Sequence, residues 1–253
     1  MGAKSDTYAF QAGADYTDAN RKYAMGVFVD YVGSTIDMPF DTDADSGTEG
    51  FGAYITYRPE KWHFDLFIRM SEGRYRVNIP HTPEIETNTG SASIAVTVGR
   101  HYALKSGITL VPEVQAAWTR TNVDTTKDSV PIDGTGENFY GREYRIKPIQ
   151  STSTRASLLV SKLLNIKKGY ELRPYVRGAF SYEFDAETNM SVQTIAEPRP
   201  IKYKNDLGGA WGTINAGASL RIKDRFDVWT DVAWNFAGKT DGYNINLGAG
   251  YRF

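Results

Sequence analysis

Apolar and polar residues alternate with a period of two along almost the whole chain. In the last segment, the odd positions from Tyr243 to Phe253 are apolar or aromatic, whereas the even positions are asparagine, glycine and arginine. Segments further upstream repeat this pattern, and no stretch has a convincing helical period. Because successive side chains of a β-strand point to opposite faces, the alternation predicts strands with one apolar and one polar face.

About eleven such segments can be counted, many of them about ten residues or longer, whereas strands of soluble proteins usually have about five or six residues. They cover approximately residues 7–17, 22–36, 48–58, 61–78, 90–104, 108–122, 151–163, 169–185, 209–223, 225–237 and 242–253. Strands of about 9–11 residues can cross a bilayer at a tilt. Soluble sandwiches also contain alternating strands, so it is the repetition of long strands that favours a membrane barrel.

The connections between these segments alternate between short and long. Short turns are expected at about residues 18–21, 58–61, 105–107, 165–169 and 223–224. Long polar loops are expected at residues 37–47, 79–90, 123–150 and 186–208, and the last loop of this series, at residues 238–241, is unusually short. Transmembrane barrels have short periplasmic turns and longer extracellular loops, whereas a soluble sandwich has no reason to sort its loops in this way. The chain therefore predicts an up-and-down barrel with its long loops outside.

Composition agrees with a barrel once the two faces are considered separately. The mean hydropathy of −0.44 and the net charge of −1 are ordinary for a soluble chain, but half of the side chains in a barrel strand face a polar lumen. No apolar run approaches the about 18 residues of a membrane helix, and backbone in lipid is satisfied only by helices or closed barrels. Aromatic residues near strand ends suit the girdles at the membrane interfaces, with a soluble core as the alternative. These residues are Tyr16, Tyr23, Tyr57, Tyr102, Tyr243, Tyr251 and Phe253.

Residue counts exclude several functions. The balance of 29 basic against 30 acidic residues excludes a nucleic-acid binder that acts through bulk charge. The absence of cysteine excludes disulfides, thiol nucleophiles and thiolate zinc sites, and 3 histidines leave little material for a histidine metal cluster. We therefore expect no metal, no other cofactor and no nucleic-acid partner.

Several motifs rich in aromatic residues and glycine carry a resemblance to a known family. They are residues 10–16 (FQAGADY), 50–57 (GFGAYITY), 64–70 (FDLFIRM), 174–184 (PYVRGAFSYEF) and 247–253 (LGAGYRF). In their order and spacing, from about Tyr8 to Phe253, the chain resembles the C-terminal translocator domain of type V autotransporters. That domain is a twelve-stranded outer-membrane barrel that exports its own passenger.

The resemblance implies a transmembrane antiparallel up-and-down β-barrel over residues 7–253, preceded by a short polar extension at residues 1–6. It implies a domain that anchors and translocates an N-terminal passenger across the outer membrane of a Gram-negative bacterium. The expected partners are outer-membrane lipid and lipopolysaccharide, the barrel assembly machinery and the passenger itself. The alternatives are a stand-alone outer-membrane porin or adhesin-like barrel whose long loops bind solutes or surfaces, and a soluble β protein.

The sequence departs from the family in two places. Thr97 stands where the family often has a glutamate, which removes one lumen charge. The family's first strand and the helix that threads its pore have no counterpart before Tyr8, and residues 1–6 carry no export signal. Because bacterial barrels have an even number of antiparallel strands, we predict a fragment, a truncated product or a mis-started gene model that is one strand short of twelve.

Ionisable residues on the polar face are expected to line the lumen, where they pair with one another or contact a plug helix or a passing chain. They are Asp15, Asp30, Asp65, Arg69, Glu113, Arg155, Arg173, Arg177, Glu183, Arg221, Asp227, Asp231 and Arg252. By resemblance, Leu247, Tyr251 and Phe253 form a C-terminal signal that the barrel assembly machinery reads through strand addition. The alternative for these three is an ordinary place in the aromatic girdle.

Catalysis is the alternative use of the histidines. A barrel protease or lipase needs histidine with aspartate or serine at the outer rim or on the lipid face. His63 and His101 lie at the periplasmic end, and His81 lies in an outer loop without a clear third member, so we expect no enzyme activity. The acidic loop at residues 37–49 lacks the spacing and bidentate glutamate of a calcium loop, which favours a solvated loop.

Overall fold

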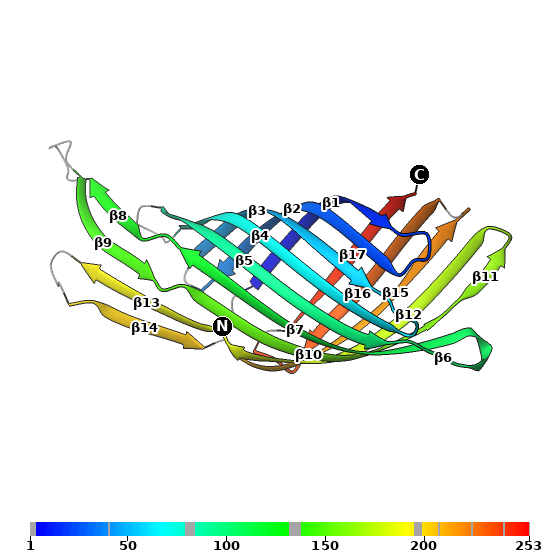
Figure 1. Cartoon of the computed structure of the whole chain (residues 1–253). Helices are drawn as coiled ribbons and strands as arrows, with labels where there is room; N and C mark the ends of the chain where they lie inside the picture. Colours follow the sequence, from blue (N-terminus) through cyan, green and yellow to red (C-terminus); the bar gives the residue numbers. More distant parts are fainter. Residues whose placement is uncertain are drawn as a thin grey trace.

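Long antiparallel strands make up most of the structure. A computed structural model describes residues 4–39, 41–78, 84–131, 138–194, 199–206, 208–223, 225–239 and 241–252, with the backbone alone at 129–131 and 138–140. Eleven long strands pair in the order in which they follow one another along the chain (Figure 1). They are β1 (Lys4–Thr17), β2 (Tyr23–Met38), β3 (Thr42–Tyr57), β4 (Trp62–Asn78), β5 (Ile85–Arg100), β7 (Ile108–Val123), β10 (Ile149–Lys162), β12 (Tyr170–Asp185), β15 (Gly209–Ile222), β16 (Phe226–Phe236) and β17 (Gly242–Tyr251).

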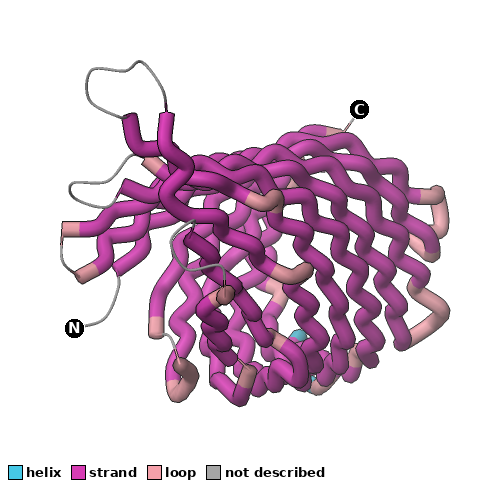
Figure 2. The backbone as a smooth tube through the Cα atoms, turned by 90° about the vertical axis from the view of Figure 1, so that its left-hand side faces the viewer, coloured by secondary structure: helices cyan, strands magenta, loops and turns pink. Residues whose placement is uncertain are grey.

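The sheet is strongly curled, as Figure 2 shows, so the predicted all-β, up-and-down barrel architecture is confirmed. At the short-turn end, β6 (Tyr102–Ala103) pairs with β7, and β11 (Leu164–Lys167) pairs with β12. The only helical element among the described residues is the 3-10 turn η1 (Lys105–Gly107). No helix in the described part of the chain combines the length and the apolar character needed to span a membrane.

The outer ends of the strands extend further than the alternation predicts. Residues 37–47 were expected as a loop, but β2 and β3 stay in register as far as the Met38–Thr42 pair. The turn follows directly, with Asp41 in the left-handed region at φ 53°, which aspartate tolerates better than most residues. Beyond the membrane both faces of a strand meet water, so a strand there needs fewer apolar positions and its alternating pattern is weaker.

The expected loops at 123–150 and 186–208 contain a second sheet for the same reason. Its strands are β8 (Thr126–Pro131), β9 (Asn138–Ile146), β13 (Glu187–Thr194) and β14 (Ile201–Asp206), in the order β14-β13-β9-β8. Here β8 and β9 continue the hairpin of β7 and β10, and β13 and β14 continue that of β12 and β15 (Figure 1). The prediction of long polar loops is therefore wrong at these two places, and we call this part the outer sheet.

The sheet does not close on itself within the described residues. β1 and β17 are the two ends of the strand order and do not pair with one another. Each strand is antiparallel to the next, so the first and the eleventh run parallel. One further strand, antiparallel to both, is what antiparallel closure requires. Every residue of β1 is exposed, as expected at an open edge.

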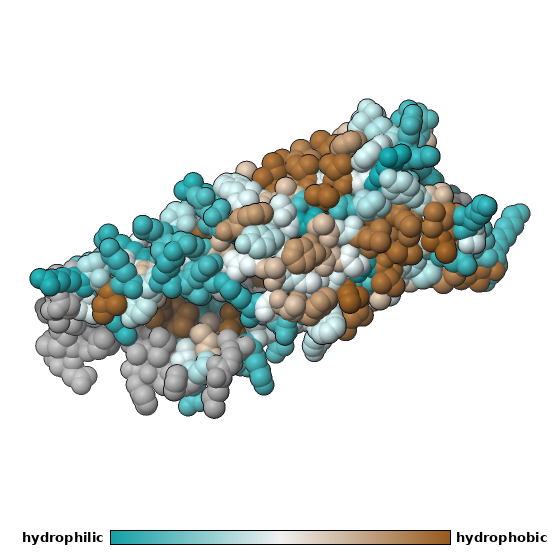
Figure 3. Space-filling view, turned by 90° about the horizontal axis from the view of Figure 1, so that it is seen from below, coloured by the Kyte–Doolittle hydropathy of each residue, from teal (hydrophilic) through white to brown (hydrophobic). Residues whose placement is uncertain are grey.

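The two faces of the curled sheet differ in chemistry. On the convex face side chains diverge, and large apolar residues such as Phe10 and Leu247 are 70% and 80% exposed. On the concave face, called the inner face below, side chains converge, and Ala233 and Ser181 are only 3% and 4% exposed. Figure 3 shows apolar side chains gathered over the curled sheet and hydrophilic ones over the outer sheet.

Candidate functional site on the inner face

Polar side chains on the inner face make contacts that reach across a whole strand. Nε and Nη2 of Arg69 on β4 donate to Oδ2 and Oδ1 of Asp30 on β2, at 2.8 and 2.6 Å. Between them lies β3, which places Gly50 opposite Asp30. A Cβ at Gly50 would lie 2.6 Å from Oδ1 of Asp30 and 2.7 Å from Nη2 of Arg69. Glycine at this position therefore provides the space for the bidentate ion pair.

The same arrangement joins two tyrosines to aspartates. Each phenol hydroxyl donates to a carboxylate two strands away, at 3.2 and 3.1 Å, and a glycine of the intervening strand lies in register between the two residues. A Cβ at either glycine would lie within 2.7 Å of the tyrosine ring. The sets are Tyr54, Gly26 and Asp15 on β3, β2 and β1, and Tyr175, Gly217 and Asp231 on β12, β15 and β16.

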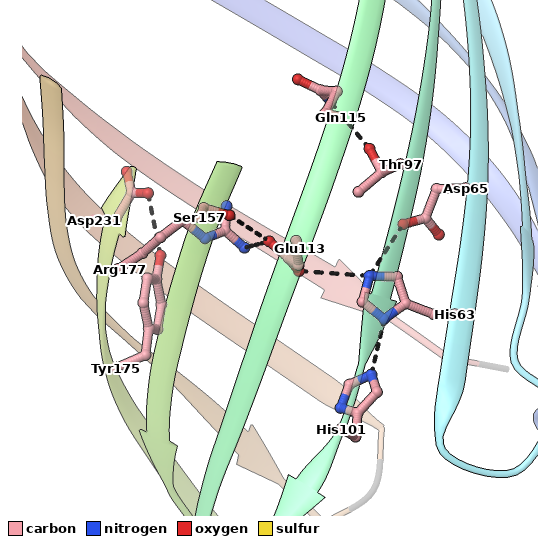
Figure 4. A network of polar contacts seen from close by, with 10 residues as sticks. All are labelled: His63, Asp65, Thr97, His101, Glu113, Gln115, Ser157, Tyr175, Arg177 and Asp231. Carbon is pink, nitrogen blue, oxygen red and sulfur yellow. Dashed lines mark hydrogen bonds and ion pairs between the residues drawn. The ribbon is translucent and has the colours of Figure 1, made fainter. Parts of the chain in front are cut away.

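A fourth contact of this kind joins His63 of β4 to Glu113 of β7 over Gly99 of β5 (Figure 4). Nε2 of His63 lies 3.5 Å from Oε1 of Glu113 and 3.7 Å from Oδ2 of Asp65. Its Nδ1 lies 3.0 Å from Nε2 of His101, so one hydrogen is shared between the two rings. His63 is 6% exposed, and the lack of a side chain at Gly99 leaves room for its imidazole.

Glu113 continues this network towards β10 and β12 (Figure 4). Its Oε2 accepts a hydrogen bond from Oγ of Ser157 at 3.1 Å and lies 3.2 Å from Nη2 of Arg177. Nearby, Nε2 of Gln115 donates to Oγ1 of Thr97 at 3.0 Å. Thr97 therefore belongs to an uncharged pair on the inner face.

A separate cluster joins β15, β16 and the chain end. Asp227 accepts a hydrogen bond from Nε of Arg221 at 2.9 Å and lies 2.7 Å from Nη2 of Arg252. Nη1 of Arg221 is also 3.7 Å from Glu171 of β12. Two cations thus share two carboxylates, which balances the charge locally.

The remaining charged residues of the predicted set behave differently from one another. Glu183 accepts a hydrogen bond from Oγ of Ser151 at 2.7 Å, whereas Arg173 is exposed. The side chain of Arg155 makes no hydrogen bond or ion pair within the described part of the chain. It lines a cavity of about 290 Å³ together with Arg177.

The sequence reasoning missed the uncharged partners of these groups and the glycines beneath them. The missed partners are Tyr54, Gln115, Ser151, Ser157, Tyr175 and Asn246, the last of which donates to Oδ1 of Asp231 at 2.7 Å. The signal that could have found them is their position on the polar side of the alternation. The inner face also holds Phe28 and Phe67, whose rings stack at 5.4 Å.

Comparison with known proteins places the chain in a family. The family model described as the autotransporter β-domain matches residues 1–233. The chain belongs to the autotransporter β-domain family. The resemblance seen in the sequence is therefore confirmed, and with it the function of an outer-membrane barrel domain that translocates a passenger. A stand-alone porin or adhesin-like barrel is not favoured.

Solved structures show the same fold at low sequence identity. The β-domain of the Bordetella autotransporter BrkA matches with a TM-score of 0.71 and 14% identity, covering 99% of this chain and 92% of that one. The translocator domain of NalP from Neisseria meningitidis has a TM-score of 0.74 and 10% identity, covering 99% and 81%. The transport unit of AIDA-I from Escherichia coli has a TM-score of 0.71 and 17% identity, covering 99% and 84%. No match was found among curated proteins.

The expected C-terminal signal of this β-domain lies on its open edge. Leu247 and Tyr251 of β17 are 80% and 51% exposed on the apolar face, and the ring of Tyr251 lies 4.9 Å from that of Phe226 on β16. Phe253 lies outside the described residues. The role of these three residues in assembly stays a prediction.

The histidines of the β-domain do not form a catalytic arrangement among the described residues. His63 and His101 contact each other, and the hydroxyl of Ser157 donates to Glu113 rather than to an imidazole. His81 lies outside the described residues.

In the acidic segment at residues 37–49, Asp43 accepts a hydrogen bond from Asn78 at 2.9 Å, so part of this segment pairs with β4.

Proposed function

We propose that the inner face of this β-domain lines the route along which the passenger crosses the outer membrane of a Gram-negative bacterium. The observation that supports this most is the set of paired charges on the inner face behind an apolar outer face. An unpaired charge is costly in a medium of low dielectric, whereas a polar lumen tolerates paired ones. A wall whose charges are mostly paired offers hydrogen bonds to an extended chain without an apolar surface that would hold it. The domain then acts as an anchor and secretion route, and not as an enzyme.

We further propose that one strand closes the barrel between β1 and β17. Open backbone groups in lipid cost several kcal/mol each, so an open edge is not tolerated in the hydrocarbon region. Because β1 and β17 run parallel, a single strand can pair with both of them in the antiparallel direction.

The proposed partners outside the lumen are outer-membrane lipid, lipopolysaccharide and the barrel assembly machinery. Lipid contacts the exposed apolar face, and stacked aromatic pairs such as Tyr23 and Tyr57, 4.8 Å apart, suit the membrane interface. The assembly machinery engages the open edge of β17 by strand addition, with Leu247, Tyr251 and Phe253 in side-chain pockets. Phe253→Ala should lower the amount of barrel in the outer membrane of cells. An unchanged assembly yield would count against the signal.

The route along the inner face is tested by surface display. In the full-length protein with an epitope in its passenger, Asn215→Trp places a bulky ring on the inner face of β15, whereas Ile214→Trp places it on the outer face. We expect epitope accessibility to antibody on intact cells to fall for Asn215→Trp and to stay unchanged for Ile214→Trp. Both proteins should fold, as judged by heat-modifiable migration on electrophoresis gels. If folded Asn215→Trp displays the epitope as well as its control, the passenger does not use the inner face.

A further inference from the structure

The cations of the inner face are not equally satisfied. Arg69, Arg221 and Arg252 each contact a carboxylate within 2.9 Å. Arg155, on β10 opposite Ser181 of β12, has no such partner among the described residues. Its neighbour Arg177 has one ion pair through Nη2, but Nε of Arg177 is buried and makes no hydrogen bond.

Both arginines line the cavity of about 290 Å³ that is formed by β7, β10, β12, β15, β16 and β17. The other polar groups of its wall include the amides of Gln115, Asn215 and Asn244 and several hydroxyls, and none of the described residues that line it is acidic. Glu113, the carboxylate partner of Arg177, is already shared between His63, Ser157 and Arg177. The cavity therefore combines the unpaired guanidinium of Arg155 and the free Nε of Arg177 with neutral hydrogen-bond donors.

We propose that this cavity binds a carboxylate group, supplied by an acidic side chain of the polypeptide that occupies or crosses the lumen. A guanidinium presents paired N–H groups in the geometry that a carboxylate accepts, and such charge-assisted bonds are the stronger ones. The volume lies at the lower limit of ligand pockets, about 300 to 1,000 Å³, which suits one or two side chains of an extended segment. This inference rests on the proposed route through the lumen. A small carboxylate solute has the same chemistry and is separated from the polypeptide by the test.

The test measures binding to the full chain refolded in detergent. The probes are a fluorescent glycine-serine peptide with central glutamates, the same peptide with glutamines, and acetate as a competitor. We expect the glutamate peptide to bind more tightly than the glutamine peptide. Arg155→Gln and Arg177→Gln should each weaken its binding about tenfold or more, the loss expected for one charge-assisted hydrogen bond.

Two further variants separate a local site from bulk charge and from misfolding. Arg221→Gln removes one positive charge from a paired cluster elsewhere on the inner face and should change binding less than about twofold. Arg155→Lys keeps the charge and should recover part of the affinity. Heat-modifiable migration on gels reports whether each variant is folded.

Each result decides the proposal. Equal binding of the two peptides, or binding of the glutamate peptide that survives both Arg155→Gln and Arg177→Gln, overturns it. If acetate binds in a way that depends on Arg155 while the glutamate peptide does not bind, the polypeptide is wrong as the source and the ligand is a small anion. The surface-display comparison of Asn215→Trp with Ile214→Trp tests the route without measuring peptide binding, so failure of the cavity and failure of the route give different results.

Discussion

Replacing Gly50 by alanine should break an ion pair that lies on two other strands. The added methyl group would occupy the space between Asp30 and Arg69, only 2.6 Å from Oδ1 of the carboxylate. Backbone pairing fixes β3 between β2 and β4, so the side chains have to move. We therefore expect Gly50→Ala to separate the two charges while leaving the strand order unchanged.

The size of the effect follows from the contacts. The side chains of Asp30 and Arg69 are 10% and 22% exposed, so solvent screens the pair only in part. Loss of this bidentate contact is expected to cost about 2–4 kcal/mol, given about 1.5–3 kcal/mol for a charged hydrogen bond and about 3–5 kcal/mol for breaking a buried pair. Alanine gains about 0.5–1 kcal/mol over glycine in a strand. The net loss in the free energy of unfolding is about 1–3.5 kcal/mol.

A glycine on the outer face provides a control for the added methyl group alone. A Cβ at Gly178 of β12 would meet no atom within 4 Å, so Gly178→Ala should keep or raise stability by about 0.5–1 kcal/mol. Urea unfolding in lipid vesicles, followed through the fluorescence of the 5 tryptophans, measures both variants. In a background that already carries Asp30→Ala and Arg69→Ala, Gly50→Ala should no longer destabilise, because the charges it displaces are gone. The reasoning is wrong if Gly50→Ala costs the same in both backgrounds, or if it behaves like Gly178→Ala.

Three further predictions concern other parts of the molecule. Gly99→Val should displace the imidazole of His63 and lower the urea midpoint, and it should broaden the histidine NMR signals; an unchanged spectrum would contradict the crowding seen at this glycine. Ile245→Lys puts a charge on the apolar face and should cost up to about 2–4 kcal/mol in vesicles near the bilayer midplane, whereas a lysine at an inner-face position of the same strand should be tolerated; equal costs would exclude the assignment of the two faces. In the outer sheet, the hydrogen bond from Arg145 lowers the pKa of Glu143. The contribution of this ion pair to the stability of the outer sheet is therefore present at neutral pH and is lost as the pH falls through the lowered pKa. Protection of the β9 amides from hydrogen exchange, corrected for intrinsic exchange, should decrease on acidification and should not do so in Glu143→Gln.

The sequence predicts the strands well where one face of a strand meets lipid and the other meets the polar lumen. In β17, apolar residues such as Ile245 face the outside and Asn244 faces the inside, and the two-residue period is unmistakable. The pattern is short and weak in β13 (Glu187–Thr194) and β14 (Ile201–Asp206), each of which has only two apolar residues at alternate positions. Their pairing depends on backbone hydrogen bonds and on salt bridges such as that from Lys204 to Glu187 at 2.6 Å. Hydropathy contains no information on such contacts, which is why the outer sheet was expected as loops.

The polar pairs of the inner face could be predicted only as a set. The alternation places Asp30, Arg69 and Tyr175 on the polar side of their strands, but the choice of partner depends on the register between strands, which one sequence does not contain. Arg155 shows the limit clearly, because its position in the pattern is the same as that of paired arginines. Its different surroundings become visible only when the cavity and its wall are known.

Glycines on the polar face are a sequence signal that the alternation alone does not use. A long side chain that reaches a partner two strands away has to pass over the strand between them, and any Cβ in register blocks that path. Gly26, Gly50, Gly99 and Gly217 each lie at such a crossing. Because a glycine weakens a strand by about 0.5–1 kcal/mol relative to alanine, the contact above it has to contribute more than this for the arrangement to stabilise the sheet. An inner-face glycine therefore predicts a cross-strand contact above it, and strand register is the one further fact needed to name the two partners.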